Sequence, residues 1–109
     1  MSTDHWSPTE KKIARRAFDA AHEREIAAVM EELRRRVGSM TTAKDLWEIE
    51  YFLRTRRDEF NEKYDYRYSQ LLFVFARLYH GGFLTEADLA GLSPDKIEAV
   101  KHMGDCFRK

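Results

Sequence analysis

One uninterrupted helical segment limits what this chain can fold into. It opens at Ser7-Pro8-Thr9-Glu10, where serine can cap a helix, proline suits its first position and glutamate suits a reciprocal capping box. No further glycine or proline follows before Gly38, so the segment predicts a helix of about 30 residues and roughly 45 Å. A compact chain of 109 residues has a diameter of only about 34 Å. The helix is therefore expected to extend beyond the body of its own domain.

Two stripes of apolar residues predict how the long helices pack. After Gly38, Thr42 is a suitable N-cap for a second helix with Asp45 in its first turn. The earlier turns of the first helix are rich in alanine, and its later turns carry an apolar stripe made of Ile26, Val29, Met30, Leu33 and Val37. The stripe of the second helix is made of Leu46, Ile49, Leu53, Phe60 and Tyr64. The simplest interpretation is that both stripes belong to the hydrophobic core.

The second helix carries a second apolar face. At about 100° per residue, Trp47, Tyr51 and Arg54 cluster more than a quarter-turn away from the stripe that contains Leu53. Tryptophan, tyrosine and arginine are the residues that most often anchor protein interfaces. These side chains either pack on the C-terminal helices of the same chain or meet another protein chain. Together with the length of the first helix, the second alternative predicts a homodimer.

The run from Leu71 to Ala76 fits a strand or a buried helix by periodicity alone. A lone strand in a helical chain would have no partner, so we predict a helix from Tyr66 to His80 that ends in a left-handed conformation at Gly81-Gly82. A short helical turn is expected after Thr85, and a last helix from Ser93-Pro94 to near Gly104.

These elements predict an all-α fold in one domain, residues 1–109. Residues 7–64 form the long-helix body and dimerisation region, and residues 65–109 form a small helical head. Residues 1–6 are expected to be a flexible tail, in which Trp6 packs beside the first helix.

Composition argues against several classes of function. Lys and Arg together number 19, as do Asp and Glu, so no net charge favours nucleic acid. No apolar run approaches the roughly 20 residues that span a bilayer, and the N-terminus lacks a signal-peptide core, so a cytoplasmic protein without membrane insertion is expected. The four histidines do not pair at i, i+4, and Cys106 has no base beside it in the sequence. We therefore expect no catalytic residue, no metal and no cofactor.

One segment resembles a known family. The residues Asp45-Leu46-Trp47, Phe52-Leu53, Arg57, Glu59, Lys63-Tyr64-Asp65, Arg67, Ser69 and Phe73-Val74-Phe75-Ala76 followed by Leu78 resemble the fluorescence recovery proteins of cyanobacteria. A looser likeness extends over the first helix and over the region from Glu86 to Lys96. The resemblance implies an elongated, all-helical homodimer with a small C-terminal helical head and without a cofactor. It also implies binding to the photoactivated orange carotenoid protein, chiefly its C-terminal domain, and a faster return of that protein to its inactive orange form, which ends photoprotective quenching.

The resemblance also implies roles for particular residues. Trp47 and Arg57 fall in the dimer-interface region of the family, and Phe73 falls in its head region. Glu50-Tyr51 stands where the cyanobacterial pattern has a histidine-aspartate pair, which predicts an activity that is weakened or redirected. The expected interface and partner-binding residues are Trp47, Glu50, Tyr51, Leu53, Arg54, Arg57 and Phe73.

Two alternatives remain open at the level of sequence. The chain could be a helical interaction protein for an unrelated partner. It could also be a small all-α dimeric mutase, whose active site would need several cations converging on a dicarboxylate. Arg16, Arg36 and Arg57 are the candidates for that role, although their spacing matches no known pattern.

Overall fold

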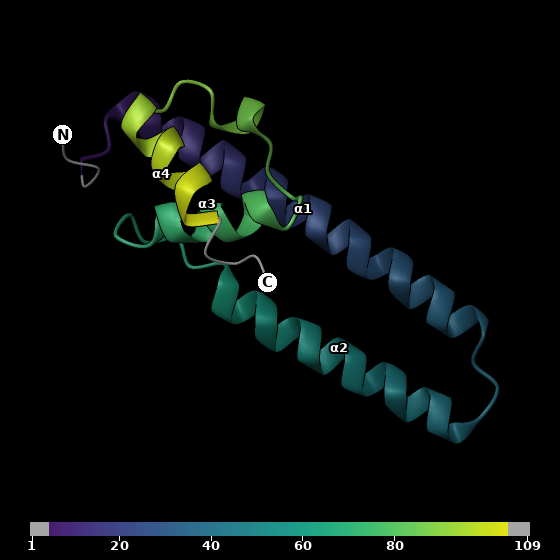
Figure 1. The fold of residues 1–109 in the computed structure, drawn as a ribbon. Coiled ribbons are helices and arrows are strands. Elements are labelled where there is room, and N and C mark those ends of the chain that lie inside the picture. Colours follow the sequence, from purple (N-terminus) through teal and green to yellow (C-terminus); the bar gives the residue numbers. More distant parts are fainter. Residues whose placement is uncertain (1–4, 105–109) are drawn as a thin grey trace.

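The computed structural model describes residues 5–104, which form four α-helices and one short 3-10 helix (Figure 1). In chain order these are α1 (Pro8–Gly38), α2 (Ala43–Lys63), α3 (Leu71–His80), η1 (Glu86–Leu89) and α4 (Pro94–Gly104). The described residues contain no β-strand, and the all-α prediction is confirmed. The radius of gyration is 16.6 Å and the dimensions are 57 × 28 × 21 Å. A compact chain of this size would have a radius of gyration near 13 Å, and the difference arises because α1 and α2 project from the head as an antiparallel hairpin.

The sequence signals at the starts of the long helices are realised as hydrogen bonds. Ser7 Oγ accepts a hydrogen bond from the Glu10 backbone N–H, and Glu10 Oε1 accepts one from the Ser7 N–H, each at 3.1 Å. Thr42 and Asp45 make the same reciprocal pair at the start of α2, at 3.1 and 3.2 Å. Each capping box satisfies two backbone N–H groups that a helix N-terminus otherwise leaves unpaired. The first residue of each long helix is therefore set by its local sequence.

The hydrophobic core lies in the head, where α3 and η1 pack against the N-terminal half of α1 and α4 packs against α3 (Figure 1). Ala14, Ala17 and Ala21 of α1 are almost completely buried, and their small side chains let the neighbouring elements approach the α1 backbone. α1 contributes no buried side chain beyond Ala21. The larger core side chains are Ile13, Phe18, Leu71, Val74, Phe75, Leu78, Leu84, Leu89, Leu92 and Val100.

The connection between α2 and α3 differs from the prediction. α3 begins at Leu71 rather than Tyr66, and residues 64–70 are not helical. The cause is aromatic packing, because the rings of Tyr64 and Tyr66 both meet Phe18 edge-on, at centroid distances of 5.3 and 4.9 Å. Residues two apart point to the same side of an extended chain but to nearly opposite sides of a helix. A continuous helix through this segment would lose one of the two contacts.

Two predicted details of the head are confirmed. Trp6 packs against the head, where it is 5% exposed, with its ring 5.7 Å from Tyr68 and Lys96 Nζ 4.8 Å above it. The folded head therefore begins before the Ser7 cap, and Trp6 itself is not part of a flexible tail. α3 ends at His80, and the left-handed residue of the Gly81-Gly82 pair is Gly82, with φ of 89°.

Side-chain contacts join α1 to the C-terminal end of α2 where the hairpin meets the head. Glu25 of α1 accepts hydrogen bonds from Lys63 Nζ at 2.6 Å and from the Tyr64 hydroxyl at 2.7 Å. The His22 ring lies 5.3 Å from Phe60 and 4.7 Å from Tyr64. Burial, together with the Glu25 carboxylate, raises the pKa of the Tyr64 hydroxyl. These contacts fix the end of α2 nearest the head.

Candidate interaction surface

The apolar stripes of the hairpin are largely exposed. On α2, Ile49 and Phe60 are buried, but Leu46 and Leu53 are 47% and 39% exposed. On α1, Ile26, Met30 and Val37 are 36% to 48% exposed, whereas Val29 and Leu33 are half-buried. The expectation that both stripes are buried in the single chain is therefore confirmed only in part, because most of α2 has only α1 to pack against. The exposed residues, called the hairpin face below, are Ile26, Met30, Val37, Leu46 and Leu53.

Both stripes of the hairpin face lie on the same side of the hairpin. On α1 the stripe is about a quarter-turn from Glu25 and Arg36, the side chains that contact α2. On α2, Leu46 and Leu53 are about a quarter-turn, in the same rotational sense, from Lys63, which contacts α1. Because the two helices run in opposite directions, equal rotations in the same sense bring both stripes to one side. An exposed apolar surface shared by two helices is typical of a protein interaction site.

Trp47 and Tyr51 lie beside the hairpin face, on the outer side of α2. They are 65% and 62% exposed, so the interpretation in which they pack on the C-terminal helices of the same chain is wrong. The Arg54 guanidinium lies 5.6 Å from the Tyr51 ring and 3.5 Å from a carboxylate oxygen of Glu50. The structure therefore brings four of the predicted site residues together on two turns of α2.

A groove of about 590 Å³ adjoins Trp47 and Tyr51. Phe52 lines it, with the guanidinium of Arg36 at 4.3 Å and that of Arg56 at 5.8 Å from the Phe52 ring. The Nε of Arg56 is buried and has no acceptor among the described residues. Sequence reasoning missed this groove, because a cation from α1 above a ring from α2 leaves no periodic signal in either helix.

Arg57 and Phe73 complete the set of predicted site residues. Arg57 is exposed on α2, one turn after Leu53, and its side chain makes no hydrogen bond or ion pair within residues 5–104. Phe73 is 55% exposed on α3, in the head, so the structure does not place it with the α2 residues.

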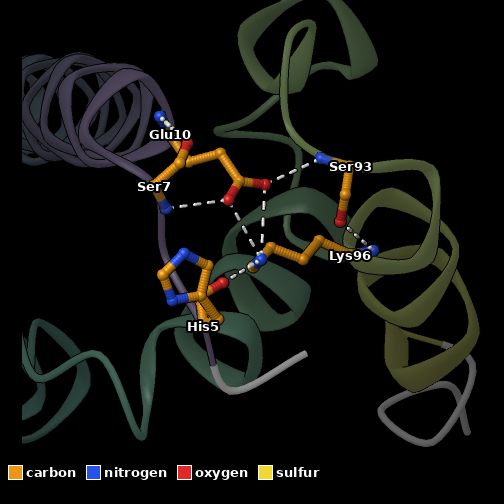
Figure 2. A network of polar contacts seen from close by, with 5 residues as sticks. All are labelled: His5, Ser7, Glu10, Ser93 and Lys96. Atoms are coloured by element: carbon orange, nitrogen blue, oxygen red, sulfur yellow. Dashed lines mark hydrogen bonds and ion pairs between the residues drawn. The ribbon is translucent and has the colours of Figure 1, made fainter. Parts of the chain in front are cut away.

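The most deeply buried charges of the described chain lie in the head, where sequence reasoning did not expect them (Figure 2). Lys96 Nζ lies 3.2 and 3.3 Å from the two carboxylate oxygens of Glu10 and also donates to the backbone carbonyl of His5. Glu10 further accepts hydrogen bonds from the backbone N–H groups of Ser7 at 3.1 Å and Ser93 at 2.9 Å. The two Ser-Pro helix starts were visible in the sequence, but not their juxtaposition.

The environment of Glu10 favours its charged form. Burial alone would raise the pKa of this carboxyl, but the two backbone N–H groups and Lys96 outweigh burial and lower the pKa from 4.5 to about 2. The Arg24 guanidinium similarly donates two hydrogen bonds, of 2.6 and 3.2 Å, to the Asp88 carboxylate. This contact lowers the pKa of Asp88 from 3.8 to about 2. Both ion pairs join α1 to the C-terminal part of the head.

The described residues offer little for catalysis or metal binding. Arg16 and Arg36 line different surface depressions and Arg57 lines neither of them, so the cations required by the mutase alternative do not converge. Between residues 5 and 104, no three His, Cys, Asp or Glu side chains are grouped to hold a metal ion. No helix in that range is long and apolar enough to cross a membrane. Cys106 lies outside the described residues.

Comparison with known proteins gives one consistent result. A family described as photoprotection regulator fluorescence recovery protein matches residues 6–104. The fluorescence recovery protein of Synechocystis is 33% identical over 96 residues, which are 88% of each chain. The solved structure of the Fremyella diplosiphon fluorescence recovery protein is similar with a TM-score of 0.88 at 38% identity, over 93% of this chain and 99% of that one. The solved Synechocystis structure has the same TM-score and coverage at 32% identity.

Proposed function

Because the chain belongs to the fluorescence recovery protein family of photoprotection regulators, we propose that it is a non-enzymatic regulator that acts by binding another protein. The proposed partner is the photoactivated orange carotenoid protein, chiefly its C-terminal domain. The proposed effect is a faster return of that partner to its inactive orange form, which ends photoprotective quenching. One observation carries the proposal: exposed apolar and aromatic side chains cover the hairpin of a chain that matches fluorescence recovery proteins over 93% of its length.

The regulator is proposed to be a homodimer formed through the hairpin face. The five side chains of that face are apolar and 36% to 48% exposed. Burying apolar surface contributes roughly 25 cal/mol per Å², and a second copy of the same face supplies a complementary apolar surface at no change of sequence. Pairing through this face would leave the head and the outer side of α2 accessible to another protein.

Partner binding is proposed to use the outer side of α2 and the head. Trp47, Tyr51 and Arg54 are the residue types that dominate binding energy at interfaces, and Phe73 adds an exposed ring in the head. A regulator that binds the compact state of a two-domain partner more tightly shifts the equilibrium toward that state by its differential affinity. This mechanism assigns no bond-making step to any side chain.

The Glu50-Tyr51 pair is expected to change how well this chain acts on a cyanobacterial partner. Relative to the histidine-aspartate pair, Glu50 puts a carboxylate at the first position and Tyr51 removes the carboxylate from the second. Arg54 of the same helix contacts both side chains. The surface offered beside Trp47 therefore differs in charge distribution from the histidine-aspartate pattern. We expect weaker acceleration than a cyanobacterial member produces, or binding to a diverged partner of the same architecture.

The test is a recovery assay. Photoactivated orange carotenoid protein is placed in the dark with and without an excess of this protein, and the return of the orange absorption spectrum is followed. Recovery should be faster with the protein present. Trp47→Ala should reduce the effect while leaving the circular dichroism helical, because Trp47 is 65% exposed. Identical recovery kinetics, together with no complex on size-exclusion chromatography, would reject this function and leave the family fold intact.

A further inference from the structure

The groove beside Trp47 and Tyr51 lies on the side of the hairpin away from the hairpin face. Its volume is about 590 Å³, and Thr55 lines it on α2. Thr55 is nine residues after Leu46, which places the two side chains about half a turn apart on the helix. The groove is therefore accessible whether or not the hairpin face is covered.

The lining of this groove combines aromatic rings with cations. Ligand pockets typically have volumes of about 300–1,000 Å³ and pair an apolar lining with a few polar groups. Glu48 is the one carboxylate among the described residues that line the groove. The aromatic and cationic residues of the lining are Trp47, Tyr51, Phe52, Arg36, Lys44 and Arg56. Such a lining favours a flat apolar ligand that carries negative charge.

The two guanidinium groups of the groove retain unused hydrogen-bond donors. Arg36 bonds to Glu32 through its Nε at 2.8 Å, and Arg56 pairs with Glu59 through a terminal nitrogen. The Nε of Arg56 is buried and has no acceptor within residues 5–104. A buried donor without an acceptor is unfavourable. An oxyanion that accepts a hydrogen bond from this atom would therefore make an interaction that the chain alone does not provide.

A carboxylate matches these donors in geometry. Arginine can bind a carboxylate through two parallel hydrogen bonds, one of which can come from Nε. Because the Arg56 Nε has almost no exposed surface, the side chain must rotate to present it, and that side chain is 42% exposed. The guanidinium groups of Arg36 and Arg56 lie 4.3 and 5.8 Å from the Phe52 ring. A ligand stacked beside Phe52 therefore has both groups nearby.

We propose that this groove binds a small aromatic carboxylate, whose ring lies against Trp47 and Tyr51 and whose carboxylate is bound by Arg36 and Arg56. The two aromatic side chains are 65% and 62% exposed, so their rings are available for offset or edge-on contacts with the ligand. Trp47 and Tyr51 also belong to the surface proposed for the partner protein. A bound acid would therefore compete with that protein.

Titration with 2-naphthoate tests the site. The chain has two tryptophans, and their indole N–H groups can be followed separately by proton–nitrogen NMR. 2-Naphthoate should shift the signal of Trp47 and leave that of Trp6, which is 5% exposed in the head. Naphthalene-2-carboxamide has nearly the same shape without the charge. It should bind about ten-fold more weakly, because hydrogen bonds to an ionised acceptor are stronger than those to a neutral one.

Arginine variants identify the groups that bind the carboxylate. Arg36→Gln and Arg56→Gln should each raise the dissociation constant of 2-naphthoate by about ten-fold, and should change that of the carboxamide little. Arg34→Gln is the matched control, because Arg34 is 65% exposed on α1, lies 3.4 Å from Glu31 and does not line the groove. Its affinity for 2-naphthoate should equal that of the unmodified chain. Circular dichroism should show the same helix content in every variant.

Three results would overturn the proposal. The first is no shift of the Trp47 signal at millimolar 2-naphthoate. The second is equal affinity for the acid and the carboxamide, and the third is an unchanged affinity for the acid in both groove variants. An acidic peptide that binds to the groove when 2-naphthoate does not would assign it to a protein partner instead. Because these measurements use the chain alone, they are independent of the recovery assay.

Discussion

Lys96 and Glu10 are 86 positions apart in the sequence, yet Lys96 Nζ lies 3.2 and 3.3 Å from the two carboxylate oxygens of Glu10. Their side chains are only 3% and 11% exposed. The pair joins the first turn of α1 to the first turn of α4, and the Ser93 backbone N–H adds a second bond to the same carboxylate at 2.9 Å. The Glu10 carboxylate therefore serves the N-terminal turns of two helices at once, and it ties the two ends of the described chain together.

Removing the cation of this pair should destabilise the head. Lys96→Met leaves the Glu10 carboxylate buried without its counter-charge, which typically costs about 3–5 kcal/mol of unfolding free energy. Lys101→Met is the matched control, because Lys101 pairs with Glu86 at 3.3 Å in an exposed position and should cost less than about 1 kcal/mol. Urea denaturation followed by circular dichroism measures both. Equal shifts of the two midpoints would show that the buried pair contributes no more than a surface one.

Stability should also depend on pH through Glu10. The pKa of this carboxyl is 4.5 when unperturbed and about 2 in the folded chain. A lowered folded-state pKa stabilises the fold above the unfolded value, and the contribution disappears as the pH falls from about 4.5 to about 2. Glu10→Gln removes this titration, so its free energy of unfolding should fall less steeply in that window. If the free energy of unfolding plotted against pH has the same slope for Glu10→Gln and for the unmodified chain, the pH dependence does not come from Glu10. Asp88, whose pKa is also about 2, adds to the slope of both curves.

Gly91 should not tolerate a side chain. Its φ is 101°, and a Cβ built there would lie 2.4 Å from the Cδ1 of Ile13 in the core. Gly82 also has a positive φ, 89°, but nothing lies within 4 Å of its Cβ position. Gly82→Ala should therefore cost about 1 kcal/mol for backbone strain alone, and Gly91→Ala should cost clearly more because Ile13 must move. Thermal unfolding of the two variants measures the difference. A melting temperature of Gly82→Ala below that of Gly91→Ala would contradict this account.

The helix starts could be predicted from sequence because their causes are local. Ser7 with Glu10, and Thr42 with Asp45, make hydrogen bonds across three residues, so the signal and the contact coincide in the chain. The start of α3 could not be predicted in the same way. Its position depends on the packing of Tyr64 and Tyr66 around Phe18, more than 40 residues earlier by the numbering, and helical periodicity carries no information about such a contact.

The candidate surface could be predicted only in part, for the same reason. The excess of apolar residues on α2 was visible in the sequence, and Trp47 and Tyr51 are indeed exposed. What periodicity could not distinguish was a stripe buried within the chain from a stripe left exposed, because both have the same spacing. The difference depends on where the head ends, which long-range packing decides. Leu53, expected in the core from its stripe and also named among the expected interface residues, is 39% exposed.

The hairpin face should hold two copies of the chain together. Light scattering at micromolar concentration is expected to give about twice the 12.9 kDa of one chain. Leu53→Glu should give a folded monomer, because the charge is tolerated at a position exposed in the single chain but would be buried without a counter-charge in the dimer. Thr55→Glu, on the opposite side of α2, is the matched control and should remain dimeric. An unchanged mass for Leu53→Glu would place the interface elsewhere.

Arg57 should matter for activity more than for folding, in contrast to its neighbour Arg56. Arg57 has no partner within the described residues, so Arg57→Leu should change the free energy of unfolding by no more than about 0.5 kcal/mol. Arg56 pairs with Glu59 and lies 5.8 Å from the Phe52 ring, so Arg56→Leu should lower stability measurably. In the recovery assay the order should reverse: Arg57→Leu slows the return of the orange form, because an exposed guanidinium makes its forked hydrogen bonds only across an interface. Assays at concentrations well above the dimer dissociation constant separate direct partner contact from loss of the dimer. Full acceleration by Arg57→Leu under both dilute and concentrated conditions would assign Arg57 no part in the function.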